Sequence, residues 1–150
     1  ELLDETGERI QTVGGEFGAT TGRPRRCGWL DMVVLSTSIR LNGLAGLAIT
    51  KLDVLTGIPT LKIAVAYQCG KDQMTAVPPE LKALEACEPI YQEFPGWEED
   101  LRGTRRFDDL PENTRRYLQA VEDMAGVPLS IVSVGPGRDE TILLRHPYEH

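Results

Sequence analysis

The chain has 150 residues, of which 41% are hydrophobic, as is typical of one folded domain with a packed core. Its formal net charge of -7 excludes a protein whose whole surface binds nucleic acid or anionic lipid, so any anion-binding site must be local. No apolar run approaches the roughly 20 residues that span a bilayer. The first residues show no secretory signal pattern, so we expect a cytoplasmic protein without a membrane segment.

The first half of the chain predicts a flexible loop, one helix and two strands. Residues 14–31 combine Gly, Thr, Arg and Pro, and the first half of this segment cannot form a regular helix or a central strand. Residues 29–41 place apolar side chains at helical spacing, and the Asn-Gly that follows predicts the end of this helix. Residues 44–50 predict a short buried strand with polar groups at its C-terminal end, and residues 60–69 predict a second strand that ends in the turn CGKD.

The middle of the chain predicts two short elements and a loop. Residues 78–86 predict a short helix that is entered through proline. The sequence EPIYQEFPGW, residues 88–97, alternates as an edge strand does and is expected to end at Pro95. Residues 96–109 carry many charged side chains, so we expect a solvated loop there.

The strongest helix signal covers residues 111–125, where apolar side chains form one stripe. Asp108 or Asp109 is the expected N-cap, and Gly126 is the expected C-cap. Residues 127–137 predict a strand that runs into a Gly/Pro loop. Strands that alternate with helices through short connections predict an α/β, or layered α+β, domain in which helices flank a mixed sheet.

The three cysteines, Cys27, Cys69 and Cys87, lie far apart in the sequence and form no CxxC pair. This spacing argues against a disulfide framework or a zinc site, so we expect three reduced thiols that act as small packing residues. The two histidines, His146 and His150, stand at the end of the chain and are expected to be exposed. The sequence therefore predicts no metal site.

Residues 14–26, the Gly/Arg loop, form a candidate anion site. The hydroxyls of Thr20 and Thr21, with backbone N–H groups freed by the neighbouring glycines, can wrap a carboxylate or a phosphate. Arg23 and Arg25 alternate along an extended segment, so they can converge on one ligand. The alternative is an exposed basic loop that pairs with the chain's own acidic side chains.

Two further candidate sites follow predicted strands. In the TKLD turn, residues 50–53, the carboxylate of Asp53 can accept two hydrogen bonds from guanine while the stem of Lys51 covers the purine face, as in the NKxD loop of regulatory GTPases. In the SVGPG loop, residues 133–137, free backbone groups and the Ser133 hydroxyl can bind a base edge or a phosphate. The alternatives are a surface lysine beside a helix-capping aspartate, and an ordinary glycine turn.

The order and content of these segments resemble a known family. GEFGATTGRPRRCGWLD, NGLAGLAITKLDVLTGIPTLKIAVAY, EPIYQEFPGW, FDDLPENTRRYLQAVEDMAGVPLSIVSVGP and RDETILLRHP are similar to the C-terminal third of adenylosuccinate synthetase. The resemblance covers nearly the whole chain. It implies a single domain, residues 1–150, that is the C-terminal part of a larger α/β nucleotide-dependent ligase.

The resemblance also implies an activity and its partners. The family joins L-aspartate to inosine monophosphate (IMP) with GTP as co-substrate and Mg²⁺ present, and it yields adenylosuccinate, GDP and phosphate. It works as a homodimer, and its Mg²⁺ would be bound by the N-terminal part. The family's catalytic Asp and His also lie in that part, so we expect no catalytic residue and no turnover in these 150 residues alone.

The resemblance assigns two sets of binding residues. Those for aspartate and IMP are Ala19, Thr20, Thr21, Gly22, Arg23, Pro24 and Arg25. Those for GTP are Arg25, Lys51, Leu52, Asp53, Ser133, Val134 and Gly135. Arg23 and Arg25 would orient substrates and neutralise their charge rather than transfer protons.

The chain departs from the family pattern at four positions. Val134 and Gly137 stand where many members have Thr and Asp, and Ser36 and Thr37 stand where basic residues are common. The chain also starts with Glu rather than Met, which favours a fragment or a processed piece.

Two other functions compete with the ligase. One is a non-catalytic module that binds guanine nucleotide or regulates a partner. The other is an RNA-binding module built on the sequence RPRR, which the net charge and the lack of interleaved aromatic residues disfavour.

Overall fold

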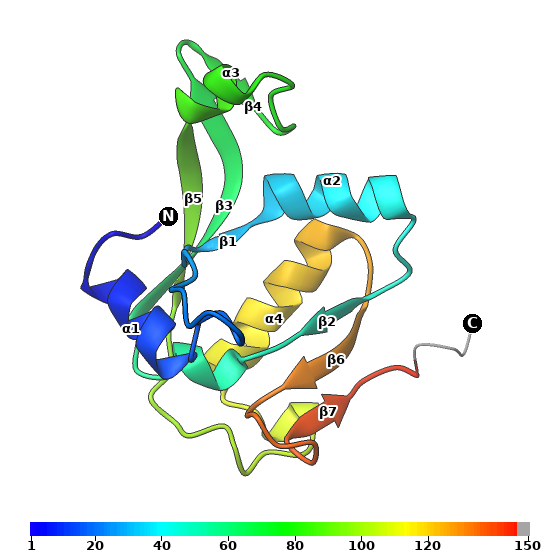
Figure 1. Ribbon diagram of the computed structural model, residues 1–150. Helices are drawn as coiled ribbons and strands as arrows, with labels where there is room; N and C mark the ends of the chain where they lie inside the picture. The colour runs from blue at the N-terminus through cyan, green and yellow to red at the C-terminus, as the bar shows by residue number, and fades with distance from the viewer. Residues whose placement is uncertain (147–150) are drawn as a thin grey trace.

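The computed structural model describes residues 1–146 as two small sheets with helices packed around them (Figure 1). One sheet contains β1 (Leu30–Asp31), β3 (Thr60–Cys69), β4 (Asp72–Met74) and β5 (Glu88–Pro95). The other contains β2 (Leu47–Ile49), β6 (Leu129–Ser133) and β7 (Thr141–Leu143). Each sheet holds one parallel pair, β1 with β3 and β2 with β6, beside antiparallel pairs. The predicted α/β class with mixed sheets is confirmed.

Four helices and two 3-10 turns complete the described chain. They are α1 (Glu5–Val13), α2 (Met32–Asn42), η1 (Leu52–Leu55), α3 (Leu81–Glu85), η2 (Phe107–Asp109) and α4 (Glu112–Ala125). No helix within residues 1–146 is long and apolar enough to cross a membrane. Strands β3 and β5 extend beyond the body and carry β4 and α3 at their far end, and we call these four elements the arm (Figure 1).

Helix α4 forms the centre of the core. Its buried stripe of Tyr117, Leu118 and Val121 confirms the predicted apolar face. The Tyr117 ring meets Phe94 of β5 edge-on at 5.7 Å and Trp97 at 6.0 Å between ring centroids. These contacts tie the helix to the base of the arm.

Helix α2 begins three residues later than the sequence predicts. The side chain of Asp31 accepts a hydrogen bond from the backbone N–H of Val34 at 3.0 Å and so caps the helix. The residues before it are extended because Leu30 pairs with Ile63 of β3. The predicted end is confirmed, since Gly43 closes the helix in a left-handed conformation with φ 58°.

The start of α4 and the loop before it also differ from the prediction. Asp108 and Asp109 do not cap the helix because they lie in η2, and Pro111 occupies the N-cap position without a side-chain hydrogen bond. The loop at 96–109 is not wholly solvated. Trp97 and Leu101 are buried within it and anchor it to the core.

The prediction of three reduced thiols is wrong for two of them, because Cys69 and Cys87 form a disulfide in the arm. The 18 residues between them hide their proximity in the sequence. Antiparallel pairing of β3 with β5 places Gln68 opposite Glu88, so the next residues outward face each other, with Cα atoms 4.3 Å apart. Cys27 is free and half-buried.

Candidate functional site

Parallel pairing of β2 with β6 brings two of the predicted site segments together. Ile49 is in register with Val132, so both strands run in the same direction and their carboxyl ends meet at one edge of the sheet. The TKLD turn leaves β2 at this edge, and the SVGPG loop leaves β6 beside it. Ligand groups of α/β proteins commonly lie at such strand ends.

Lys51 has an unusual backbone in the TKLD turn. Its φ of 60° makes it the one non-glycine residue in 1–146 with a positive φ. Strained backbone of this kind costs about 1–3 kcal/mol and clusters at functional sites. Leu52, which follows, is buried in the core, and Asp53 is half-buried in the first turn of η1. The turn therefore places Lys51 and Asp53 on either side of an anchoring leucine.

The SVGPG loop is closed by its own hydrogen bonds and by Glu140. The Ser133 hydroxyl donates to the carbonyl of Gly135 at 2.8 Å, and the Val134 N–H donates to the Glu140 carbonyl at 2.9 Å. The Gly137 N–H donates to the Glu140 carboxylate at 2.6 Å. A Cβ atom at Gly135 would lie 2.5 Å from that carboxyl group, so the glycine leaves room for the Glu140 side chain in this position.

Val134, a departure from the family pattern, is fully buried in the core. Its side chain therefore contributes packing within this loop. A Cβ at Gly137, the second departure, would lie 2.7 Å from the Glu140 carboxylate, so the glycine leaves room for that side chain.

The Gly/Arg loop forms a turn with an exposed tip. Phe17 pairs with Pro24 in an antiparallel bridge, and the Gly18 N–H donates to the carbonyl of Arg23 at 2.8 Å. Gly22 has φ 64°, which suits a tight turn. The residues of this turn that the sequence assigns to substrate binding are all exposed, and they are Ala19, Thr20, Thr21, Gly22, Arg23, Pro24 and Arg25.

Within this loop, two arginines pair with acidic side chains of the same chain. Arg25 Nη1 donates to Glu16 Oε2 at 3.0 Å, and Arg26 Nη1 lies 3.8 Å from Glu1 Oε2. The alternative interpretation of the loop, internal pairing of its charges, is therefore seen for these two residues. Thr21 Oγ1 accepts from the Arg23 N–H at 3.3 Å, so this hydroxyl also has a partner inside the loop.

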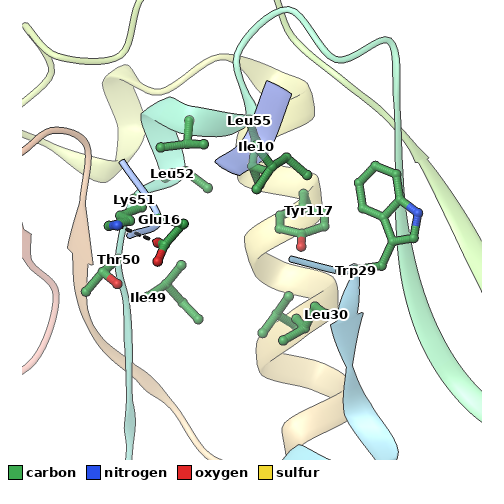
Figure 2. Close-up of a pocket in the computed structure, with 13 residues that line it drawn as sticks. Ile10, Glu16, Trp29, Leu30, Ile49, Thr50, Lys51, Leu52, Leu55 and Tyr117 are labelled. Carbon is green, nitrogen blue, oxygen red and sulfur yellow. Dashed lines mark hydrogen bonds and ion pairs between the residues drawn. The ribbon is translucent and has the colours of Figure 1, made fainter. Parts of the chain in front are cut away.

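Glu16 connects the Gly/Arg loop to the TKLD turn, which sequence reasoning did not identify. The Lys51 ammonium forms a close ion pair with Glu16 Oε1 and donates to the carbonyl of Gly14 at 2.7 Å (Figure 2). The hydrogen bond from Lys51, followed by that from Arg25, holds the pKa of the Glu16 carboxyl below its ordinary value. An acidic residue at the root of a basic loop is the signal that could have found it.

A second group missed in the sequence is Arg102. It binds Asp100 through both oxygens of the carboxylate, at 3.0 and 2.8 Å. Asp100 raises the pKa of the Arg102 guanidinium most strongly, and the charges of Asp53 and Glu140 add to this effect. Arg102 therefore lies within electrostatic range of both strand-end segments.

A cavity of about 350 Å³ lies beneath the junction between Glu16 and Lys51. Figure 2 shows Ile49 on one side and Trp29 on the other, with Tyr117 of α4 and Leu30 between them. Burial raises the pKa of the Tyr117 hydroxyl to about 12. The cavity is apolar except at the end that carries Glu16, Thr50 and Lys51.

The described residues do not offer a metal centre. No group of three or more His, Cys, Asp or Glu side chains within residues 1–146 could hold a metal ion. His146 is exposed, as expected, and His150 lies outside the described residues.

The fold and these loops define an α/β protein with polar segments gathered at the carboxyl ends of parallel strands. A family model, adenylosuccinate synthetase, matches residues 1–142. The chain belongs to the adenylosuccinate synthetase family, a family of ligases of purine biosynthesis.

Individual relatives agree with this assignment. The adenylosuccinate synthetase of Syntrophobacter fumaroxidans is 73% identical over 148 residues, and that of Desulfatibacillum aliphaticivorans is 58% identical over 148 residues. Each match covers 99% of this chain and 34% of the relative. A solved structure of the fully ligated adenylosuccinate synthetase from Plasmodium falciparum has a TM-score of 0.92 at 36% identity and covers 97% of this chain and 35% of that one. The chain spans about a third of the length of the curated relatives it matches.

Proposed function

We propose that the chain is the C-terminal part of a GTP-dependent ligase that joins L-aspartate to IMP and forms adenylosuccinate, GDP and phosphate on the route to AMP. The observation that carries this proposal is the convergence of three polar segments. Register between β2 and β6 puts the TKLD turn beside the SVGPG loop, and Glu16 joins the Gly/Arg loop to Lys51. Membership of the adenylosuccinate synthetase family supports a ligase reaction of this kind.

In this proposal the TKLD turn and the SVGPG loop bind the guanine base of GTP. The half-buried carboxylate of Asp53 accepts hydrogen bonds from the ring N–H and the exocyclic amine of guanine, a donor pair that adenine lacks. Lys51 covers the purine face with its aliphatic stem. Backbone groups of Ser133, Val134 and Gly135 complete the base pocket, and the hydrogen bond from the Val134 N–H to the backbone carbonyl of Glu140 holds this part of the loop in place.

The Gly/Arg loop binds the substrates that carry negative charge. Thr20, Thr21 and Arg23 lie on its exposed turn, where they can meet the carboxylates of aspartate, and Arg23 also reaches the ribose of IMP. Arg25, at the root of the loop, serves both aspartate and the phosphates of GTP. The 6-oxygen of IMP first receives the γ-phosphoryl group of GTP. These residues orient the reactants and neutralise charge while the aspartate amine attacks C6, the C6–O bond breaks and the 6-oxygen leaves as part of the phosphate.

Proton transfer and metal binding belong to the remainder of the protein in this proposal. When bound there, Mg²⁺ neutralises charge on the phosphates of GTP. The 150 residues alone then have no turnover. The cytoplasm and a homodimer are the proposed setting of the full-length protein.

The test compares the full-length protein with the 150-residue chain. Each is incubated with IMP, L-aspartate, Mg²⁺ and either GTP or ATP, and adenylosuccinate is measured by chromatography. We expect product from the full-length protein with GTP, little with ATP, and none from the 150-residue chain. Absence of product from a folded full-length protein would refute the ligase, and product from the short chain would refute the division of roles.

A further inference from the structure

Glu16 is a single carboxylate shared by two cations from different parts of the proposed site. Its Oε1 pairs with Lys51 of the TKLD turn, and its Oε2 accepts from Arg25 of the Gly/Arg loop at 3.0 Å. The two cations come from segments 26 residues apart, so no local turn brings them together. Each oxygen has its own partner, so both contacts exist at the same time.

The backbone reinforces both halves of this bridge. The Arg25 N–H donates to the carbonyl of Glu16 at 2.9 Å, and Lys51 Nζ donates to the carbonyl of Gly14 at 2.7 Å. The Glu16 N–H in turn donates a hydrogen bond to the backbone carbonyl of Gln11 in α1 at 2.8 Å. Glu16 is therefore fixed at the end of α1 rather than carried on the exposed tip of the loop.

The exposure of the three side chains shows which of them is the fixed partner. The Glu16 side chain is 21% exposed, whereas those of Lys51 and Arg25 are 47% and 57% exposed. A carboxylate that is less exposed than its two partners and anchored by its backbone sets the position of both cations. A movement of one cation then changes the electrostatic environment of the other.

We propose that Glu16 is a positioning residue that couples the guanine subsite to the aspartate subsite. This inference rests on the proposed function, which assigns Lys51 to the base and Arg25 to aspartate. A guanine base that packs against the Lys51 stem fixes its ammonium on Glu16 Oε1. Glu16 then presents Arg25 in one orientation, and aspartate binds to an arginine that is already placed.

Coupling of this kind is reciprocal. If guanine nucleotide raises the affinity for aspartate by some factor, aspartate raises the affinity for guanine nucleotide by the same factor. Couplings between two sites typically change affinity about 5- to 150-fold. The bridge predicts a coupling in this range that depends on the charge of Glu16.

The experiment measures this factor in the full-length protein with and without the bridge. Binding of the non-hydrolysable GTP analogue guanosine 5′-(β,γ-imido)triphosphate is followed by calorimetry at saturating IMP, with and without saturating L-aspartate. In the unmodified protein we expect the two Kd values to differ at least about fivefold. In Glu16→Gln, which keeps the size and loses the charge, we expect their ratio to fall to about 1.

Two further variants separate coupling from mere stability. Glu16→Asp keeps the charge on a shorter arm and should recover part of the ratio. Glu8→Gln removes one negative charge from the exposed surface of α1 and should keep the ratio of the unmodified protein. If Glu16→Gln does not fold, as judged by tryptophan fluorescence, a full unmodified ratio in Glu16→Asp overturns the inference and a reduced ratio supports it.

The possible results distinguish this inference from the proposed function. If the unmodified protein makes no adenylosuccinate, the proposed function fails. If it makes adenylosuccinate but Glu16→Gln keeps the ratio of Kd values, the function holds and the coupling role is refuted. A ratio near 1 in the unmodified protein also refutes the coupling role.

Discussion

At the scale of single residues, the site depends on side chains whose positions are set by contacts distant in sequence. Lys51 adopts a left-handed backbone between a short strand and a buried leucine, and its ammonium reaches back to Glu16 and Gly14. Asp53 follows two positions later, in the first turn of η1. Because this turn is pinned by Leu52, substitutions at Lys51 and Asp53 should change binding more than folding.

Asp53→Asn should weaken the preference for GTP over ATP in the full-length protein. The carboxylate accepts two hydrogen bonds from guanine, whereas an amide presents one acceptor and one donor. A hydrogen bond to a charged group contributes about 1.5–3 kcal/mol, so we expect the preference in kcat/KM to fall roughly 10-fold or more. Asp108→Asn in the exposed turn η2 is the matched control. An unchanged preference would remove Asp53 from base recognition.

Arg25→Ala should raise the KM for aspartate in the full-length protein. The variant loses a charge-assisted contact to the substrate, which corresponds to a rise of roughly 10-fold or more. Arg26→Ala is the control, because the neighbouring arginine has the same charge but pairs with Glu1 instead of Glu16. Steady-state kinetics at fixed GTP and IMP measure the KM for aspartate of both variants. Equal effects of the two substitutions would argue for general electrostatic attraction and against a direct contact between Arg25 and aspartate.

At the scale of helices and strands, the elements that could be predicted are those whose own residues show a clear apolar pattern. The observed β3 agrees with the predicted range 60–69, and α4 differs from its predicted range by one residue. By contrast, α1 was not predicted, since few of its residues are apolar. Its start depends on the Asp4 side chain, which accepts from the Gly7 N–H at 3.0 Å. Short elements of this kind depend on capping and packing more than on periodicity.

The candidate site also has parts that can be predicted from local sequence and one part that cannot. The Gly/Arg loop and the two strand-end segments are visible in the sequence because their residue types suit anions and bases. The link between them is not visible, because Glu16 is one acidic residue in an irregular segment and its partner Lys51 lies 35 positions away. Nothing periodic marks such a pair. Packing of α1 against η1, which includes the hydrogen bond from Arg9 to the carbonyl of Thr56, brings its members together.

The packing of α4 predicts a change of stability at alkaline pH. Burial raises the pKa of Tyr117 to about 12, above its ordinary value, so the folded protein favours the neutral hydroxyl. The contribution of neutral Tyr117 to stability is complete below the pKa that this residue has in the unfolded chain. It is lost as pH rises through the pKa that the residue has in the folded protein. Between pH 10 and 12, Tyr117 should lower the free energy of unfolding by about 1.4 kcal/mol per pH unit.

Urea unfolding of the protein and of Tyr117→Phe between pH 8 and 12 measures this contribution. The phenylalanine variant keeps the ring contacts with Phe94 and Trp97 but lacks the ionisable group. We expect its stability to fall less steeply above pH 10, while the two proteins remain similar at pH 8. Parallel curves would show that the Tyr117 hydroxyl is not the group that resists ionisation.

At the scale of the whole molecule, the arm is a distinct structural feature whose base contacts the body through Phe94 and Tyr117 of α4. Its far end is joined by the disulfide between Cys69 and Cys87. Disulfides are uncommon in reducing compartments. Such a cross-link would therefore be uncommon in the cytoplasm that is proposed for the full-length protein.

Peptide mapping tests the disulfide directly. Trypsin cleaves after Lys71 and Lys82, which lie between the two cysteines. Without reductant, we expect peptides 63–71 and 83–102 to remain joined and to separate when reductant is added. Thiol titration of the unfolded protein should give one reactive cysteine before reduction and three after it. Separate peptides from an air-oxidised, unreduced sample would contradict the cross-link.

The arm has a further consequence for backbone hydrogen exchange. Its β3–β5 ladder runs from Thr60 opposite Pro95 to Gln68 opposite Glu88, with the core holding one end and the cross-link the other. At the tip, β4 also pairs with the other edge of β3, so β5 is an edge strand there. Strand ends far from a core usually fray first. Here the free end is closed, so oxidised protein should protect the amides of Gln68 and Glu88 against deuterium exchange. After reduction, pairing of β3 with β5 can open from the tip. Deuterium exchange should then begin at Gln68 and Glu88 and reach the amides near the body later.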